Sequence, residues 1–194
     1  MGSFLSGTEP YGFGSLSDWS YDSKSSDVSS EETAPAGIAF KPDGNKMFII
    51  GFSGDAVLSY TLSTAWDVST ASYDSVSFSV SSQETTPYGM FFKPDGTKMY
   101  IVGNTSDTVY QYSLSTAWDI STLSYESKSV SVAVRDSFPT DVAFKPDGTQ
   151  MFVLGDAGYN IIEYTLSTAW DVSTATFVAE GPSMSSQNID PRGI

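Results

Sequence analysis

The sequence predicts an all-β repeat protein, on three observations. Residues 37–88, 89–140 and 141–192 are three copies of one 52-residue unit, in register and without insertions. Each copy contains short segments in which apolar and polar residues alternate, which is the period of a β-strand. No segment shows the spacing of an amphipathic helix, and Gly- or Pro-containing turns separate the segments. A fixed period of this size indicates repeated supersecondary units packed against one another.

The first two strands of each unit are expected on either side of a Pro-Asp-Gly turn. In the first copy, residues 38–41 and 46–51 are apolar runs that flank this tripeptide. Proline fixes φ at the first corner, aspartate caps the turn, and glycine adopts a positive φ that other residues resist. We therefore interpret the repeated turn glycines as structural residues; they are Gly44, Gly96 and Gly148.

Two further strands complete the unit. Residues 57–62 place Leu58, Tyr60 and Leu62 on one face, and in residues 73–80 apolar residues alternate with serine. Apolar content falls from the second strand to the fourth, which indicates a sheet running from a buried inner edge to an exposed outer edge. Four antiparallel strands in 52 residues fit one blade of a β-propeller, whose sheets pack around an axis. A β-solenoid is disfavoured because solenoid coils are usually shorter.

The repeats resemble a known group of propellers. Lys-Pro-Asp-Gly followed by Met-Phe-Ile-Ile, Met-Tyr-Ile-Val or Met-Phe-Val-Leu is similar to the Pro-Asp-Gly blades of the YVTN and PD40 families, over residues 20–194. The phrase Leu-Ser-Thr-Ala-Trp-Asp also resembles repeats of uncharacterised marine bacterial and phage-encoded propellers. The chain is less similar to WD40 repeats, which need a histidine that it lacks. The resemblance implies a fold but no single function, since propellers support unrelated activities.

The ends of the chain raise the question of closure. Residues 20–28 match the outer strand of a blade whose inner strands are missing, and residues 1–19 form an arm that does not follow the repeat. The sequence thus predicts three blades plus a lone N-terminal outer strand, whereas propeller rings have about four to eight blades. We expect either a homodimer that completes a six-bladed ring or a longer chain that supplies further blades.

Composition excludes several classes of function. The chain has 23 acidic and 9 basic residues, a formal charge of −14, which disfavours nucleic acid and anionic membranes as partners. It lacks cysteine and histidine, so thiolate metal sites, disulfides and His-based nucleophile triads are not possible. No apolar stretch is long enough for a membrane helix, and no signal peptide is visible at the start.

Candidate binding residues lie where the three copies differ, because the fold does not dictate those positions. They belong to the loops between the second and third strands and to the loops that enter the first strand, which meet at one rim of a four-stranded meander. The alternative interpretation is neutral drift of solvated loops. The predicted rim residues are Asp55, Tyr88, Asp107, Arg135, Asp141, Asp156 and Tyr159.

The repeated tryptophans Trp66, Trp118 and Trp170 each precede an aspartate. Tryptophan beside an acid can stack on a sugar, but a residue found at a fixed place in every copy is more typical of packing between repeats. We therefore predict a structural role for all three. Carboxylates are the only candidates for catalysis, and no pair of them stands out; the sequence predicts no cofactor and no metal site.

Three functions are compatible with these features. The first is a non-enzymatic interaction module, extracellular or on a virion surface, that adheres to a glycan or surface protein through the variable rim. The second is a purely structural subunit of a larger assembly. The third is a carboxylate-based hydrolase or lyase, which needs two acids converging in a pocket at the ring axis. The absent histidine favours the first, so the sequence predicts that the protein is not an enzyme.

Overall fold

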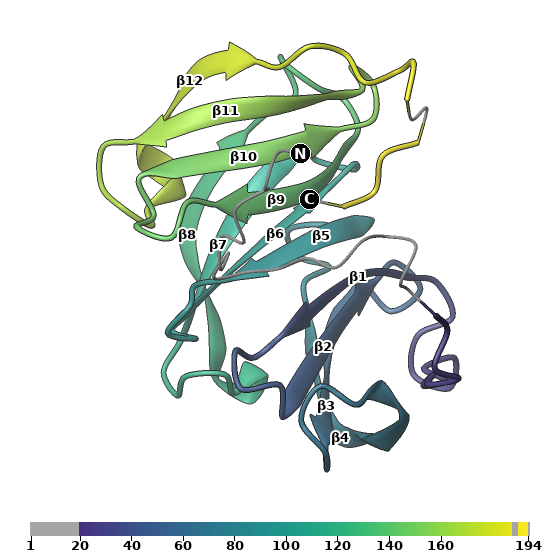
Figure 1. Ribbon diagram of the computed structural model, residues 1–194. Coiled ribbons are helices and arrows are strands. Elements are labelled where there is room, and N and C mark those ends of the chain that lie inside the picture. The colour runs from purple at the N-terminus through teal and green to yellow at the C-terminus, as the bar shows by residue number, and fades with distance from the viewer. Residues whose placement is uncertain (1–19, 188–189, 194) are drawn as a thin grey trace, which may run out of the picture.

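The computed structural model describes residues 20–187 and 190–193, in three four-stranded antiparallel sheets (Figure 1). The predicted arm, residues 1–19, lies outside this range. Blade 1 consists of β1 (Pro35–Phe40), β2 (Lys46–Gly51), β3 (Ala56–Leu62) and β4 (Ala71–Ser79). Blade 2 consists of β5 (Pro87–Phe92), β6 (Lys98–Gly103), β7 (Thr108–Leu114) and β8 (Leu123–Ser131). Blade 3 consists of β9 (Pro139–Phe144), β10 (Gln150–Gly155), β11 (Asn160–Leu166) and β12 (Ala175–Glu180).

Each sheet has its strands in chain order, which confirms the predicted propeller blade. The first strands β1, β5 and β9 pack side by side, and the fourth strands lie at the outside (Figure 1). A short 3₁₀ turn joins the third and fourth strands of each blade; the turns are η2 (Val68–Thr70), η3 (Ile120–Thr122) and η4 (Val172–Thr174). These 3₁₀ turns were not predicted from the sequence.

The apolar core forms at the junctions between blades. One buried cluster joins blades 1 and 2 through residues such as Phe48, Met90 and Met99. A second joins blades 2 and 3 through residues such as Tyr100, Val142 and Met151. At each junction the facing surfaces of two neighbouring sheets are removed from water. Neighbouring blades therefore stabilise one another.

The tryptophans close these junctions. Trp118 of blade 2 stacks on Phe48 of blade 1, with ring centroids 6.3 Å apart. Trp170 of blade 3 stacks in the same way on Tyr100 of blade 2, with ring centroids 6.4 Å apart, and also on Phe91. Trp66 has no preceding sheet within the described chain and is 59% exposed. The repeated position thus packs one blade on the blade before it.

Residues 20–34 form no strand, yet they lie against the open side of blade 1. Val28 packs on the apolar cluster of that blade, and the ammonium group of Lys24 lies 2.8 Å from Asp67. Lys128, two repeats further along the chain, makes the same contact with Asp171. The segment therefore occupies the place of an outer strand of a preceding blade.

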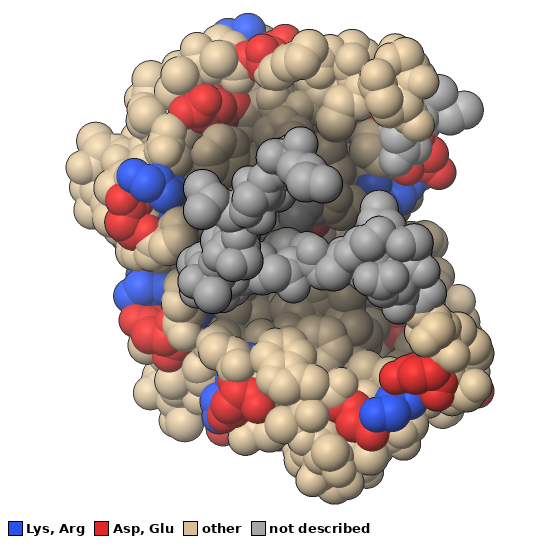
Figure 2. Space-filling model, viewed as in Figure 1, with Lys and Arg blue, Asp and Glu red and all other residues tan. Residues whose placement is uncertain are grey.

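Ion pairs accompany most of the basic residues. In Figure 2, Lys and Arg lie beside Asp or Glu around the visible edge of the molecule. Lys46 and Asp74, for example, are 2.6 Å apart. No helix in residues 20–187 or 190–193 has the length and hydropathy to cross a membrane.

Candidate functional site

A pocket of about 450 Å³ lies along the inner strands β1, β5 and β9. Its apolar wall comes from β1 and β5, including Ile38 and Met90. Its polar groups come from the starts of β5 and β9 and from the segment after β12: Tyr88, Asp141 and Arg192. We call this the axial pocket. Its position follows from the blade order, since only the first strands face the axis.

One position in the repeat explains why a carboxylate reaches this pocket. The second residue after the proline that begins each inner strand is Gly37, Gly89, Asp141 or Gly193. A Cβ atom on Gly37 would come within 2.6 Å of the Tyr88 carbonyl oxygen, and one on Gly89 within 2.6 Å of Asp141 Cα. Glycine lets adjacent inner strands approach closely there. At Asp141 the repeat departs from glycine and adds an acid to the axis.

Arg192 lies at the position of the repeat that Tyr88 and Thr140 occupy in the earlier copies. Its guanidinium group lies 5.2 Å from the ring centroid of Tyr88 and 5.3 Å from that of Phe138. Tyr88 in turn packs between Phe138 and Phe52, and the Phe52 ring is 40% exposed. The pocket mouth therefore combines one cation with a row of aromatic faces.

Asp156 also reaches this cation. One of its carboxylate oxygens lies 3.6 Å from Arg192, and the other is buried without a hydrogen-bond partner. Burial raises the pKa of Asp156, Arg192 lowers it, and the negative charges of Asp190 and Asp136 raise it further, so that the net pKa lies above its ordinary value. The structure thus brings together Tyr88, Asp141 and Asp156 of the predicted rim residues.

The other predicted rim residues have different surroundings. Asp55, Asp107 and Tyr159 share one repeat position in the turn after the second strand, with φ of 47°, 48° and 52°. Their carbonyl oxygens accept hydrogen bonds from Val80, Val132 and Met184, which tie the turn to the next loop. Burial first, then the charges of Glu84 and Asp136, raise the pKa of Asp107.

Arg135 points away from the axial pocket. Its guanidinium carbon lies 3.7 Å from the ring centroid of Phe177 in β12, and it pairs with Glu180 at 3.5 Å. The residue next to it, Asp136, is buried and turns inward. Sequence variability alone could not separate these two neighbours, because both belong to the same loop.

Sequence reasoning missed a ring of buried acids, Glu32, Glu84 and Asp136, 52 residues apart. Glu84 accepts hydrogen bonds from the backbone N–H groups of Thr86, Thr105 and Ser106. The other two acids hold the corresponding loops of their own blades in the same way. An acid at the same place in every copy was the available signal.

These acids rigidify the rim that surrounds the axial pocket. Burial alone would raise the pKa of Glu32, but hydrogen bonds from Ala34, Gly54 and Ser53 outweigh it, and the pKa lies below its ordinary value. A charged carboxylate that accepts hydrogen bonds from several backbone N–H groups stabilises the conformation of a loop strongly. Among residues 20–187 and 190–193, no group of three or more acids is arranged to hold a metal ion.

No protein-family model and no curated protein matches the chain. Solved structures do match. A Bacteroides uniformis protein provisionally named 6-phosphogluconolactonase aligns with a TM-score of 0.57 at 19% identity, covering 77% of this chain and 41% of that one. The periplasmic gluconolactonase of Pseudomonas aeruginosa aligns with a TM-score of 0.51 at 17% identity, covering 76% and 40%. Hydrazine synthase of Kuenenia stuttgartiensis aligns at 0.53 and 20% identity, covering 82% and 38%.

At these identities the likeness shows the propeller fold, and the chain spans about two fifths of the length of these structures. The names nevertheless overturn the prediction that the protein is not an enzyme, because lactonases occur on the same blades. That prediction gave too much weight to the absent histidine, which removes one type of catalytic base but leaves carboxylates. The comparisons give no support to an extracellular, virion-surface or adhesive role, and the resemblance to YVTN and PD40 repeats remains a prediction.

Proposed function

We propose that the chain carries part of a hydrolase site for a small sugar lactone, in the axial pocket. The observation behind the proposal is Asp141, an acid at an axial position where Gly37, Gly89 and Gly193 stand in the other copies, beside the cation of Arg192. Two named lactonases of the same fold supply the substrate class. The pocket volume of about 450 Å³ suits a ligand of that size.

The chemistry needs a base and a cation, and the pocket has one of each. In this proposal, the Asp141 carboxylate takes a proton from a water molecule that attacks the lactone carbonyl carbon. The Arg192 guanidinium faces the oxygen on which negative charge develops. The ring C–O bond then breaks, and the proton passes from Asp141 to the leaving alkoxide. One water is consumed and one hydroxy acid is formed.

Positioning groups surround these two residues. One oxygen of Asp141 accepts a hydrogen bond of 2.9 Å from the backbone N–H of Val142, which fixes the carboxylate relative to β9. The aromatic faces of Tyr88 and Phe52 line the approach to Arg192 and suit the C–H face of a sugar ring. The rim predicted to bind a glycan would then hold the sugar substrate.

The test is acid release from glucono-δ-lactone, followed at constant pH. The wild-type chain should exceed the buffer rate, and Asp141→Asn and Asp141→Gly should reduce the excess by about a hundredfold or more, the usual contribution of a general base. Asp147→Asn, in a Pro-Asp-Gly turn, is the matched control and should retain the rate. A wild-type rate equal to buffer, or full activity in Asp141→Gly, contradicts the proposal and favours a structural or binding role.

A further inference from the structure

The residue after each repeated tryptophan is an aspartate that caps a 3₁₀ turn at a blade junction. Each accepts a hydrogen bond from the N–H group two residues further on. Two of these acids also have an ammonium partner on the segment that precedes their blade: Lys24 lies 2.8 Å from Asp67, and Lys128 in β8 lies 2.6 Å from Asp171. At the junction of blades 1 and 2, Val76 stands where the other two have lysine. Within the described residues, no lysine or arginine pairs with Asp119.

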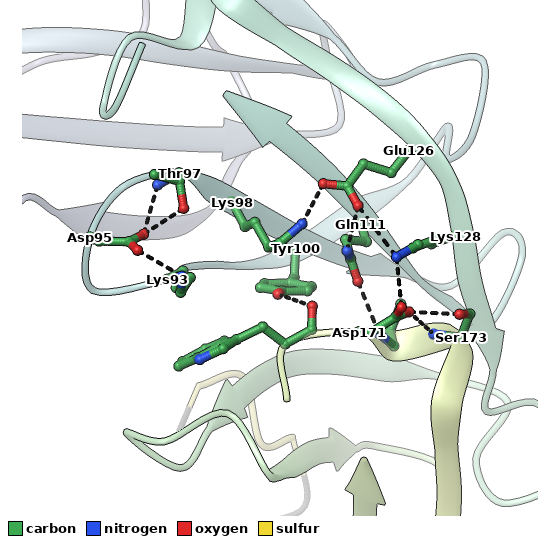
Figure 3. A network of polar contacts seen from close by, with 12 residues as sticks. Lys93, Asp95, Thr97, Lys98, Tyr100, Gln111, Glu126, Lys128, Asp171 and Ser173 are labelled. Atoms are coloured by element: carbon green, nitrogen blue, oxygen red, sulfur yellow. Dashed lines mark hydrogen bonds and ion pairs between the residues drawn. The ribbon is translucent and has the colours of Figure 1, made fainter. Parts of the chain in front are cut away.

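The junction of blades 2 and 3 shows how this space is filled elsewhere (Figure 3). Gln111 is fully buried; its Nε2 donates to Glu126, and its Oε1 accepts from the backbone N–H of Val172. The hydroxyl group of Tyr100 donates to the carbonyl oxygen of Trp170. Together with Lys128, these side chains connect the two blades.

The junction of blades 1 and 2 lacks all three of these groups. Ser59 replaces Gln111, Phe48 replaces Tyr100 and Val76 replaces Lys128. A pocket of about 530 Å³ remains there, lined by residues of both blades that include Lys46, Ser59, Val76, Trp118 and Asp119. We call it the junction pocket. It lies at the Pro-Asp-Gly end of the blades, whereas the polar groups of the axial pocket lie at the other end.

The polar groups of the junction pocket leave one negative charge without a cation. Lys46 pairs with Asp74 at 2.6 Å, and the hydroxyl groups of Ser59 and Thr61 donate to the same carboxylate. One oxygen of Asp119 accepts from Ser121, and its other oxygen corresponds to the one that Lys128 contacts at Asp171. The N–H of Ile120 corresponds to that of Val172 but has no side chain like Gln111 to accept from it.

We propose that the junction pocket binds a small polar ligand with a primary ammonium group and several hydroxyl groups, the chemistry of an amino sugar. The ammonium group takes the place that lysine takes at the other two junctions and pairs with Asp119. The hydroxyl groups meet Ser59, Thr61 and the N–H of Ile120, which lie on the pocket wall. The site is separate from the lactone site proposed above and does not depend on it.

The first test compares D-glucosamine with D-glucose, which lacks the ammonium group, by titration followed with NMR of the backbone amides. Glucosamine should shift the amide signals of residues 118–121 and bind at least about tenfold more tightly than glucose, since a hydrogen bond to a charged group contributes that much. Asp119→Asn retains the cap of the 3₁₀ turn and should abolish the difference. Asp67→Asn, at an acid that already has Lys24, is the matched control and should preserve it.

The second test fills the pocket with the residues of the neighbouring junction. Val76→Lys and, separately, Ser59→Gln should each weaken glucosamine binding about tenfold, as lost charged contacts would. The amide spectrum of each variant shows whether it folds, and Asp119→Asn tests the same contact without filling the pocket. The proposal is overturned if glucosamine does not bind the wild type, if glucose binds equally well, or if folded Val76→Lys and Asp119→Asn bind glucosamine as the wild type does.

Discussion

The indole ring of Trp118 lies directly over Gly96, and both residues have positive φ, 64° and 73°. A Cβ atom on Gly96 would come within 2.3 Å of Trp118 Nε1. The backbone N–H of Trp118 also donates to the Gly96 carbonyl oxygen at 3.1 Å. The same pair recurs as Trp66 with Gly44 and as Trp170 with Gly148. The turn glycine is therefore needed for the shape of the turn and also to leave room for the indole ring that packs on it.

The first prediction concerns the contact between Gly96 and Trp118. A strained backbone conformation alone costs about 1–3 kcal/mol. Gly96→Ala should destabilise the fold by more than this, because the added methyl group also displaces the indole ring. Gly54→Ala is the control, since a Cβ there meets nothing closer than 3.5 Å. Thermal unfolding followed by circular dichroism gives both values. Equal melting temperatures for the two variants would contradict the role of Gly96.

The second prediction separates the two kinds of tryptophan. Trp118→Ala should cost about 3 kcal/mol, because it empties a position packed on Phe48 and Phe92. Trp66→Ala should cost much less, because the Trp66 ring has no preceding blade to pack on. Urea unfolding of the two variants measures the difference. If the two variants lose the same free energy of unfolding, the Trp66 side chain is buried in solution, contrary to the structure.

The third prediction is a pH dependence that comes from Glu32. Its folded-state pKa lies below the ordinary 4.5, so its contribution to stability is complete above pH 4.5 and is lost as pH falls through the lower folded value. Glu32 accepts hydrogen bonds from the backbone N–H groups of Ala34, Ser53 and Gly54. Glu32→Gln removes the charge and one of the two acceptor oxygens, and should destabilise at pH 7 by about 1–3 kcal/mol. The gap between wild type and variant should narrow below pH 4.5. A gap that stays constant from pH 7 to pH 3 would show that Glu32 is not the titrating group.

The sequence was sufficient to predict the blade and insufficient to predict the site, for a physical reason. Strand positions follow from local alternation and turn chemistry, which is why residues 46–51 were expected as a strand and form β2. The axial pocket depends on which loops meet in space. Arg192 lies 104 residues after Tyr88, and nothing local relates them except the shared place in the repeat. Asp141 could be predicted as a rim residue because the copies differ at that position, where the other copies have glycine.

Two outer strands, β4 and β8, contain a bulge that the local sequence also did not predict. Ser75 and Ser127 have positive φ, 58° and 57°, in the middle of β4 and β8. Serine has no preference for this conformation. The bulges accompany the register shifts between the third and fourth strands, near Asp74 and Glu126, the acids that pair with Lys46 and Lys98. Tertiary contacts, rather than the serines themselves, account for the bulge.

The last prediction concerns self-association, for which the equivalent residues at the three junctions give the argument. Met90 and Val142 are 6% and 2% exposed where they meet the preceding blade, whereas Ile38 is 54% exposed in blade 1. Trp66 and Ile38 are thus two apolar side chains on the side where a preceding blade would pack, and such faces are seldom left open in soluble proteins. We predict that two copies associate and cover this side.

Light scattering at micromolar concentration should give the mass of a dimer. The double variant Ile38→Asp with Trp66→Glu should have the mass of a monomer and an unchanged circular dichroism spectrum. Val134→Asp, at another exposed apolar side chain, is the control and should remain dimeric. A wild-type chain that is folded and monomeric would show that the open side of blade 1 needs no second copy.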